Sequence, residues 1–155
     1  CGVVPGIQEL TAQGRNINLA ISLHGASQEL RNRLMPINRK YPFPEVIQAA
    51  DAYEKSNGRQ VMYEYILLAG INDRPEDARN LADALEHKEC VINLIPANPV
   101  PEKGFERPSD RAVDRFFQML KKRRLNVTVR KEMGKDINAA CGQLRASALK
   151  EAQNQ

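Results

Sequence analysis

Polar side chains follow two apolar runs of the sequence, at the positions where a parallel α/β fold carries its chemistry. Ser22, Leu23 and His24 end the first run, and Asn98 follows a later one. Active sites of such folds lie at the carboxyl ends of the strands, so these residues are expected along one edge of a sheet. Taken singly, a histidine at the position of His24 is more often a hydrogen-bonded strand-end residue than a catalytic group. Ser22 and Asn98 are likewise more often turn or capping residues than site residues.

The three cysteines, Cys1, Cys90 and Cys141, are far apart in the sequence. Their spacing fits reduced thiols better than a disulfide framework, and it does not form a metal-cluster motif, so any metal ligands are expected outside this chain. Cys90 opens an apolar run and is expected to be buried. Cys141 opens an expected helix, whose N-terminus would lower the thiol pKa and favour the thiolate. The residues alone fit a buried and a reactive Cys141 equally well.

The hydrophobic pattern predicts strands that alternate with helices. Short apolar runs predict strands over 17–23, which is of the kind buried on both faces of a sheet, and over 61–68, 90–95 and 127–130. Helical periodicity predicts four helices: 44–57, one starting at a capping box of Asp73 and Glu76, one capped by Ser109, and 139–152. This order predicts right-handed βαβ units and a parallel sheet. Because no glycine-rich phosphate loop is present, part of a barrel is favoured over a nucleotide-binding open sheet.

Composition is that of a globular domain. The chain has 155 residues, 42% hydrophobic and 27% charged, and is expected to form one domain or part of one. It does not open with methionine, and we expect a longer polypeptide. No apolar stretch reaches the roughly 20 residues of a membrane helix, so a cytoplasmic protein is expected. The net charge of +4, with basic residues around 31–40 and 121–131, permits RNA binding, although basic helix ends explain it equally well.

Four motifs occur together along the chain: Ser22-Leu23-His24, Pro36-Ile37-Asn38, the run from Asn93 to Pro99, and the run from Asp136 to Leu144. In this order they resemble the dual-specificity rRNA and tRNA adenine-C2 methyltransferase family of radical S-adenosylmethionine (SAM) enzymes. The resemblance spans nearly the whole chain. Three residues depart from the family pattern: Gly25, Ala97 and Met133.

The resemblance implies the C-terminal part of a partial (β/α)6, TIM-like radical SAM barrel over residues 1–155. It implies that Ser22, Leu23, His24 and Asn98 contact S-adenosylmethionine, and that Cys141 becomes S-methylated. The methyl group would pass from Cys141 to carbon 2 of adenine in 23S rRNA and tRNA by a radical route. The [4Fe-4S] cluster motif, the resolving cysteine and the RNA-binding domain would precede this chain, so the chain alone is expected to be inactive. A monomer is expected.

Other functions stay open at this point. A relative that methylates carbon 8 of adenine would share these motifs, and a non-catalytic RNA-binding module would share the charge. An aldolase-like or hydrolytic barrel using His24 with Asp136 ranks last, because neither residue has an evident partner in the sequence.

Overall fold

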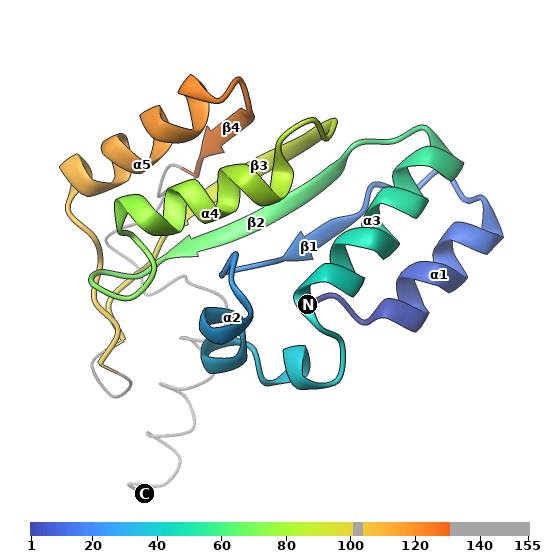
Figure 1. The fold of residues 1–155 in the computed structure, drawn as a ribbon, viewed down its shortest axis with the longest axis horizontal. Coiled ribbons are helices and arrows are strands. Elements are labelled where there is room, and N and C mark those ends of the chain that lie inside the picture. Colours follow the sequence, from blue (N-terminus) through green and yellow to red (C-terminus); the bar gives the residue numbers. More distant parts are fainter. Residues whose placement is uncertain (101–103, 131–155) are drawn as a thin grey trace, which may run out of the picture.

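The computed structural model describes residues 1–100 and 104–130, which form a four-stranded sheet with helices packed on it (Figure 1). The strands are β1 (Ala20–Ser22), β2 (Val61–Leu67), β3 (Cys90–Pro96) and β4 (Asn126–Val129). The helices are α1 (Val4–Gln13), α2 (Gln28–Leu34), α3 (Phe43–Asn57), α4 (Pro75–Leu85) and α5 (Asp110–Lys122), with a 3₁₀ helix, η1 (Pro36–Arg39), after α2.

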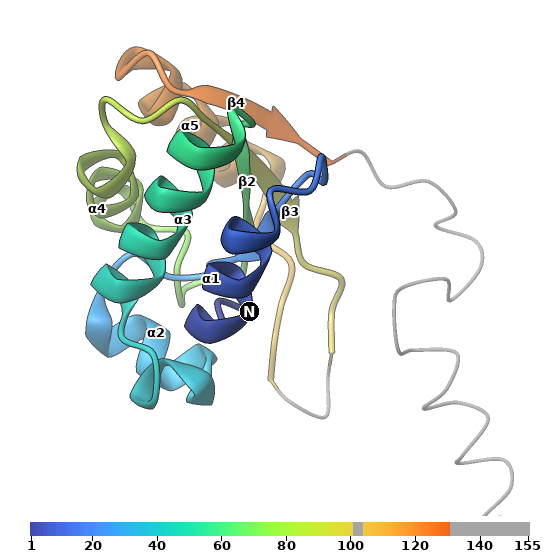
Figure 2. The ribbon, with the colours of Figure 1, turned by 90° about the vertical axis from the view of Figure 1, so that its right-hand side faces the viewer.

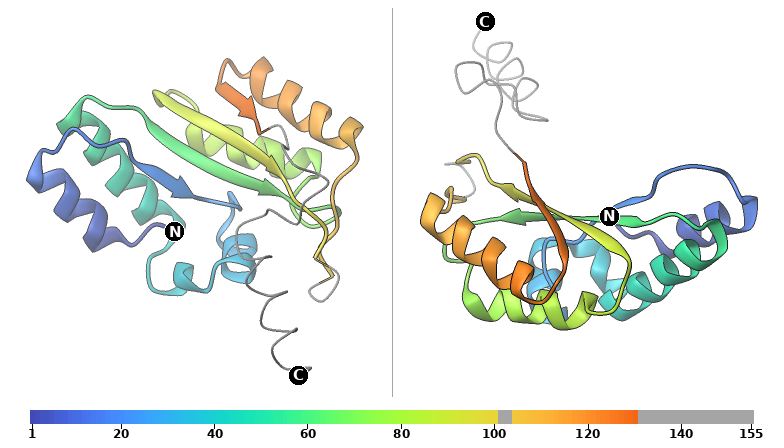
Figure 3. Two further views of the ribbon diagram at one scale, coloured as in Figure 1. Left: turned by 180° about the vertical axis from the view of Figure 1, so that it is seen from behind. Right: turned by 90° about the horizontal axis from the view of Figure 1, so that it is seen from above.

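All strand pairs are parallel, and the strands lie in the order β1-β2-β3-β4. Each strand therefore lies beside the next one in the chain, as in a (β/α) barrel, and the order does not reverse as it does in a doubly wound sheet. Figures 2 and 3 show α3, α4 and α5 on one face of a twisted sheet, while no helix of residues 1–100 and 104–130 lies over the other face. The prediction of a parallel α/β sheet from a partial barrel is confirmed.

Burial alternates strictly along the two central strands. In β2 the side chains of Val61, Tyr63, Tyr65 and Leu67 are buried under the helices, whereas those between them are half-buried or exposed. β3 shows the same alternation. The same holds for β1, where only Ile21 is buried and Ala20 is exposed. The expectation that the run 17–23 is buried on both faces is therefore wrong, because the described helices cover only one face of the sheet. The face that the described helices leave uncovered, called the open face below, can carry polar side chains.

The helix predictions based on apolar stripes are confirmed for α3 and α5. Val46, Ala49, Ala50 and Tyr53 are the buried stripe of α3, and Gly58 ends the helix in the left-handed conformation at φ 62°. The hydroxyl of Ser109 caps α5 by accepting from the amide of Ala112 at 3.2 Å. No helix of the described residues is long and apolar enough to cross a bilayer.

Two predicted boundaries are wrong, the start of α4 and the start of β1. α4 begins at Pro75, one residue after Arg74, and the carboxylate of Asp77 accepts from the amide of Arg74 at 3.1 Å. Asp73 instead accepts from the amide of Gly70, so it stabilises the preceding turn and does not cap the helix. β1 has only three residues, and Ile17 before it is 42% exposed. α1 and α2 were not predicted, and 139–152 lies outside the described residues.

Candidate functional site at the carboxyl end of the sheet

The segment Ser22-Leu23-His24 passes from β1 into the loop that leads to α2. The amides of Leu23 and His24 both donate to the backbone carbonyl of Glu64, at 2.8 and 3.4 Å, so the segment is fixed to β2. The side chain of Leu23 is fully buried in the core. Leu23 can therefore offer a ligand only its backbone, while Ser22 and His24 keep polar side chains at this edge of the sheet.

His24 adopts a left-handed backbone conformation with φ 58°, which is uncommon for a residue other than glycine. Its ring nitrogen Nδ1 accepts a hydrogen bond from the amide of Ile66 at 3.1 Å. Burial lowers the pKa of His24 to about 4, and the positive charge of Arg31 acts in the same direction against the opposing effect of Glu64. A neutral ring whose Nδ1 accepts must carry its proton on Nε2, so His24 presents an N–H donor at neutral pH.

The open face of the sheet carries one row of polar side chains, one from each strand. Ser22 pairs in register with Glu64, Glu64 with Asn93, and Asn93 with Thr128. The hydroxyl of Ser22 donates to the Glu64 carboxylate at 3.3 Å, and that of Thr128 donates to Oδ1 of Asn93 at 3.2 Å. Because the hydroxyl proton of Ser22 is engaged, Ser22 and Glu64 can only accept hydrogen bonds from a ligand.

Asn98 lies two residues after β3, at the same edge of the sheet as His24. The preceding residue, Ala97, is buried, and its amide donates to the carbonyl of Leu67 at 2.9 Å, which holds this loop to the end of β2. The side chain of Asn98 is half-buried and has no hydrogen bond to the described residues. The structure thus places Asn98 on the predicted edge without a hydrogen bond to Ser22 or His24.

The cysteines differ in environment. Cys90 is 5% exposed at the start of β3, and burial raises its pKa to about 11, so it is the unreactive thiol that the sequence predicted. Cys1 is exposed. Cys141, which carries the predicted methyl group, lies outside the described residues.

The described residues do not fit an iron–sulfur cluster. Within 1–100 and 104–130 no three histidine, cysteine or acidic side chains come together as metal ligands. The donor set does suit part of S-adenosylmethionine, since Ser22 and Glu64 offer acceptors to hydroxyl or ammonium groups and His24 offers a donor.

The basic segment around 31–40 contains one residue that cannot contact RNA. Arg31 is fully buried, and its Nη2 donates to the carbonyl of Cys1 at 2.9 Å, while Nε and Nη1 have no partner among the described residues. Arg33, Arg39 and Lys40 are exposed. Lys121 and Lys122 lie in the last turn of α5, where cations stabilise a helix C-terminus.

Comparison with known proteins identifies the family to which this chain belongs. The chain is 52% identical over 145 residues to a protein of Desulforamulus reducens named "Probable dual-specificity RNA methyltransferase RlmN", covering 94% of the chain and 41% of the relative. A protein of the same name from Bacillus subtilis is 48% identical, covering 94% and 40%. The chain belongs to this methyltransferase family. No family model matches the sequence.

Solved structures agree with membership of the methyltransferase family. The crystal structure of a radical SAM methyltransferase from Sphaerobacter thermophilus matches with a TM-score of 0.87 and 44% identity, over 92% of this chain and 42% of that protein. A domain of a pyruvate-formate lyase-activating enzyme from Bacteroides vulgatus shares the fold, with a TM-score of 0.63 and 17% identity. The chain spans about two fifths of the length of the methyltransferases that it matches.

Sequence reasoning missed two residues of the candidate site. Glu64 could have been found, because a carboxylate within the apolar run 61–68 requires an open face of the strand. Asn72, which is fully buried, contacts the backbone of His24, but nothing in its sequence context distinguishes it from a turn residue.

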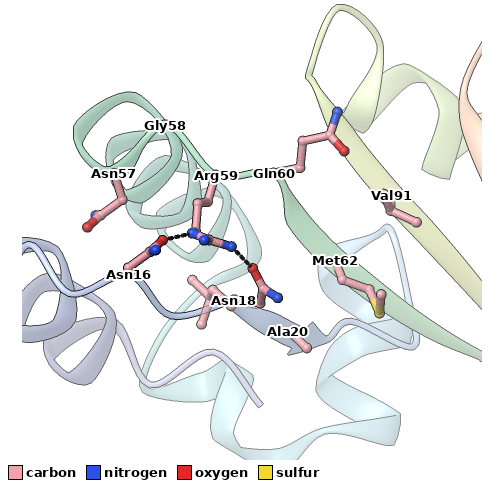
Figure 4. Close-up of a pocket in the computed structure, with 10 residues that line it drawn as sticks. Asn16, Asn18, Ala20, Asn57, Gly58, Arg59, Gln60, Met62 and Val91 are labelled. Carbon is pink, nitrogen blue, oxygen red and sulfur yellow. Dashed lines mark hydrogen bonds between the residues drawn. The ribbon is translucent and has the colours of Figure 1, made fainter.

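An open pocket lies at the opposite, amino-terminal edge of the sheet (Figure 4). Its cation, Arg59, already donates to the side chains of Asn16 and Asn18. The pocket is lined by amide and apolar side chains and lacks the predicted site residues; its lining is Asn16, Asn18, Leu19, Ala20, Asn57, Gly58, Arg59, Gln60, Met62 and Val91. It is therefore distinct from the candidate site.

Proposed function

We propose that this chain is the C-terminal part of the barrel domain of a radical SAM enzyme that methylates carbon 2 of adenine in 23S rRNA and tRNA. The observation that carries the proposal is the identity of about half the residues to proteins named dual-specificity RNA methyltransferase, over 94% of the chain. RNA substrates of this kind imply a cytoplasmic enzyme, and we expect it to act as a monomer.

The polar groups at the carboxyl edge support a role in holding S-adenosylmethionine. Glu64 and Ser22 accept hydrogen bonds from hydroxyl groups of its ribose or from its ammonium group, and His24 donates from Nε2. Asn98 adds an amide whose donors and acceptor are not used by the described residues. When bound, S-adenosylmethionine supplies the methyl group, and with a reduced cluster held by the rest of the enzyme it supplies the radical.

Cys141 is the proposed methyl carrier. Its thiolate forms a bond to the transferred methyl carbon while the sulfonium carbon–sulfur bond breaks, so the thiol proton is lost and S-adenosylhomocysteine leaves. Cys90 cannot perform this step, because it is buried and its raised pKa keeps it protonated at neutral pH. Of these two thiols only Cys141 is then expected to carry a methyl group.

The test is peptide mass analysis of the enzyme purified with its cluster, together with methylation assays of 23S rRNA and tRNA. Cys141→Ala should abolish RNA methylation and keep the iron content, and Cys90→Ala, the matched control, should keep both. A methyl group on Cys90, or methylation of RNA by the Cys141→Ala enzyme, would contradict the carrier role. A product methylated at carbon 8 would support the related adenine-C8 activity, and RNA binding without methylation by the intact enzyme would support a binding module.

A further inference from the structure

The side-chain amide of Asn72 connects three backbone groups at the edge of the candidate site. Its Nδ2 donates to the carbonyl of His24 at 3.0 Å and to that of Ile66 at 2.7 Å. Its Oδ1 accepts from the amide of Leu68 at 2.7 Å. Asn72 is fully buried, and both hydrogens of its side-chain amide are used. The contacts also fix the orientation of the amide, because Nδ2 faces two carbonyls and Oδ1 faces an N–H.

These contacts bear on the conformation of His24. Its left-handed backbone, at φ 58°, needs surrounding contacts to persist in a residue other than glycine. The carbonyl of His24 is held by Asn72, and the ring is held by the amide of Ile66, whose own carbonyl Asn72 also binds. Asn72 therefore joins the two chain segments that determine where the His24 ring lies.

We propose that Asn72 is a positioning residue for His24: it holds the turn in which Nδ1 accepts from Ile66 and Nε2–H is the ring donor offered to the cofactor. The inference rests on the proposed function only for the identity of that ligand. Asn72 itself touches no reacting atom, and its effect on binding passes through His24.

A purely structural role of Asn72 is the alternative, because Oδ1 also closes the turn at the end of β2. Two variants separate the roles. Asn72→Asp keeps an acceptor for Leu68 but places a carboxylate oxygen against the carbonyls of His24 and Ile66. Tyr65→Phe, the matched control, removes a hydroxyl that donates to the backbone carbonyl of Asn72 at 3.1 Å and leaves the contacts of the amide intact.

The first measurement is the tautomer of His24 in long-range ¹H–¹⁵N correlation spectra of protein labelled with ¹⁵N-histidine. His24→Asn assigns the signal, and exposed His87 is an internal reference. We expect one tautomer, with the proton on Nε2, in the wild type and in Tyr65→Phe, and a mixture of tautomers in Asn72→Asp. An unchanged His24 signal in Asn72→Asp would overturn the proposal. If Asn72→Asp does not fold, Asn72→Ser, which is too short to bind both carbonyls, is expected to give the same mixture.

The second measurement is the affinity for S-adenosylmethionine, by calorimetry on the enzyme with its cluster. Asn72→Asp should weaken binding by about tenfold, the effect of losing one well-placed hydrogen bond, and Tyr65→Phe by about twofold or less. In a His24→Asn background Asn72→Asp should cause no further loss, because both changes remove the same contact. Additive losses would show that Asn72 acts independently of His24 and would overturn the proposal. The tautomer measurement involves no cofactor, so a wild-type enzyme that binds no S-adenosylmethionine would overturn the proposed function alone.

Discussion

Ser22 and Glu64 are register partners on β1 and β2, and the serine hydroxyl donates to the carboxylate across the open face of the sheet at 3.3 Å. The pair thus concentrates acceptor oxygens at the point where the chain turns into the loop that contains His24. A ligand that binds there must bring its own donors, as the hydroxyls of a ribose do.

The first prediction concerns the acceptor character of Glu64. Glu64→Gln replaces one carboxylate oxygen with an NH₂ group and removes the negative charge, so hydrogen bonds from ligand donors become fewer and weaker. We expect the affinity for S-adenosylmethionine to fall by about tenfold. Calorimetry on the complete enzyme measures this, with exposed Glu89→Gln as the control. Equal affinities of wild type and Glu64→Gln would remove Glu64 from the binding site.

The second prediction follows from the neutral state of His24. Its pKa falls from an ordinary value of 6.5 to about 4 in the folded chain, chiefly through burial. Between these values the unfolded chain binds a proton that the folded chain does not, so the free energy of unfolding should decrease as the pH drops from about 6.5 to about 4. Above pH 6.5 this group should have no effect.

Denaturation at pH 7 and pH 5 checks this contribution. His24→Asn keeps an acceptor at the δ position and tolerates a positive φ, but does not titrate. It should therefore lose less stability than the wild type between the two pH values, and His87→Asn, at an exposed position, is the matched control. Parallel losses in wild type and His24→Asn would show that His24 is not held neutral.

The third prediction concerns thiol accessibility. Cys90 is buried and its pKa is raised to about 11, whereas Cys1 is exposed. Under native conditions at pH 8, iodoacetamide should modify Cys1 and leave Cys90 unmodified, because alkylation requires an accessible thiolate. Mass analysis of the peptides measures the alkylation of each cysteine. In the denatured protein both positions should be modified. Rapid native labelling of Cys90 would mean that β3 opens at its start.

The fourth prediction tests the core between the sheet and its helices. Leu94 is fully buried at the centre of β3, so Leu94→Ala should lower the free energy of unfolding by about 2–5 kcal/mol. Leu10 of α1 is only partly buried, and Leu10→Ala should cost less than half as much. Urea denaturation measures both changes. Similar costs at the two positions would show that the core does not centre on β3.

Much of this fold could be predicted from the sequence because its signals are local. The stripe of α3, the serine cap of α5 and the existence of β2 follow from helical periodicity, capping chemistry and β-branched and aromatic composition. The missed helix α1 has a single buried residue, Ile7, and the missed helix α2 has seven residues, so neither shows a long apolar stripe. The start of α4 was misplaced because Asp73 binds the amide of Gly70 in the preceding turn.

The site was predicted less completely, for a physical reason. Ser22 and His24 could be found because they end an apolar run, but the contacts that set their chemistry come from β2 and the loop after it. Glu64 and Asn72 are separated from Ser22 and His24 by more than forty residues, with hydrogen bonds over sequence separations of 42 and 48. Pairings at this distance depend on the register of the sheet, which a single sequence does not show.

The row Ser22, Glu64, Asn93 and Thr128 also has a consequence for how the strands find their partners during folding. Side chains of a strand alternate between its two faces, so a slip of one residue would turn Glu64 toward α3 and α4 and expose Tyr63 or Tyr65. A carboxylate among those helices would lose its water without gaining a partner. The polar residues of the open face therefore destabilise any sheet in which a strand pairs one residue out of register. Correct alignment of β2 is needed for folding as well as for binding.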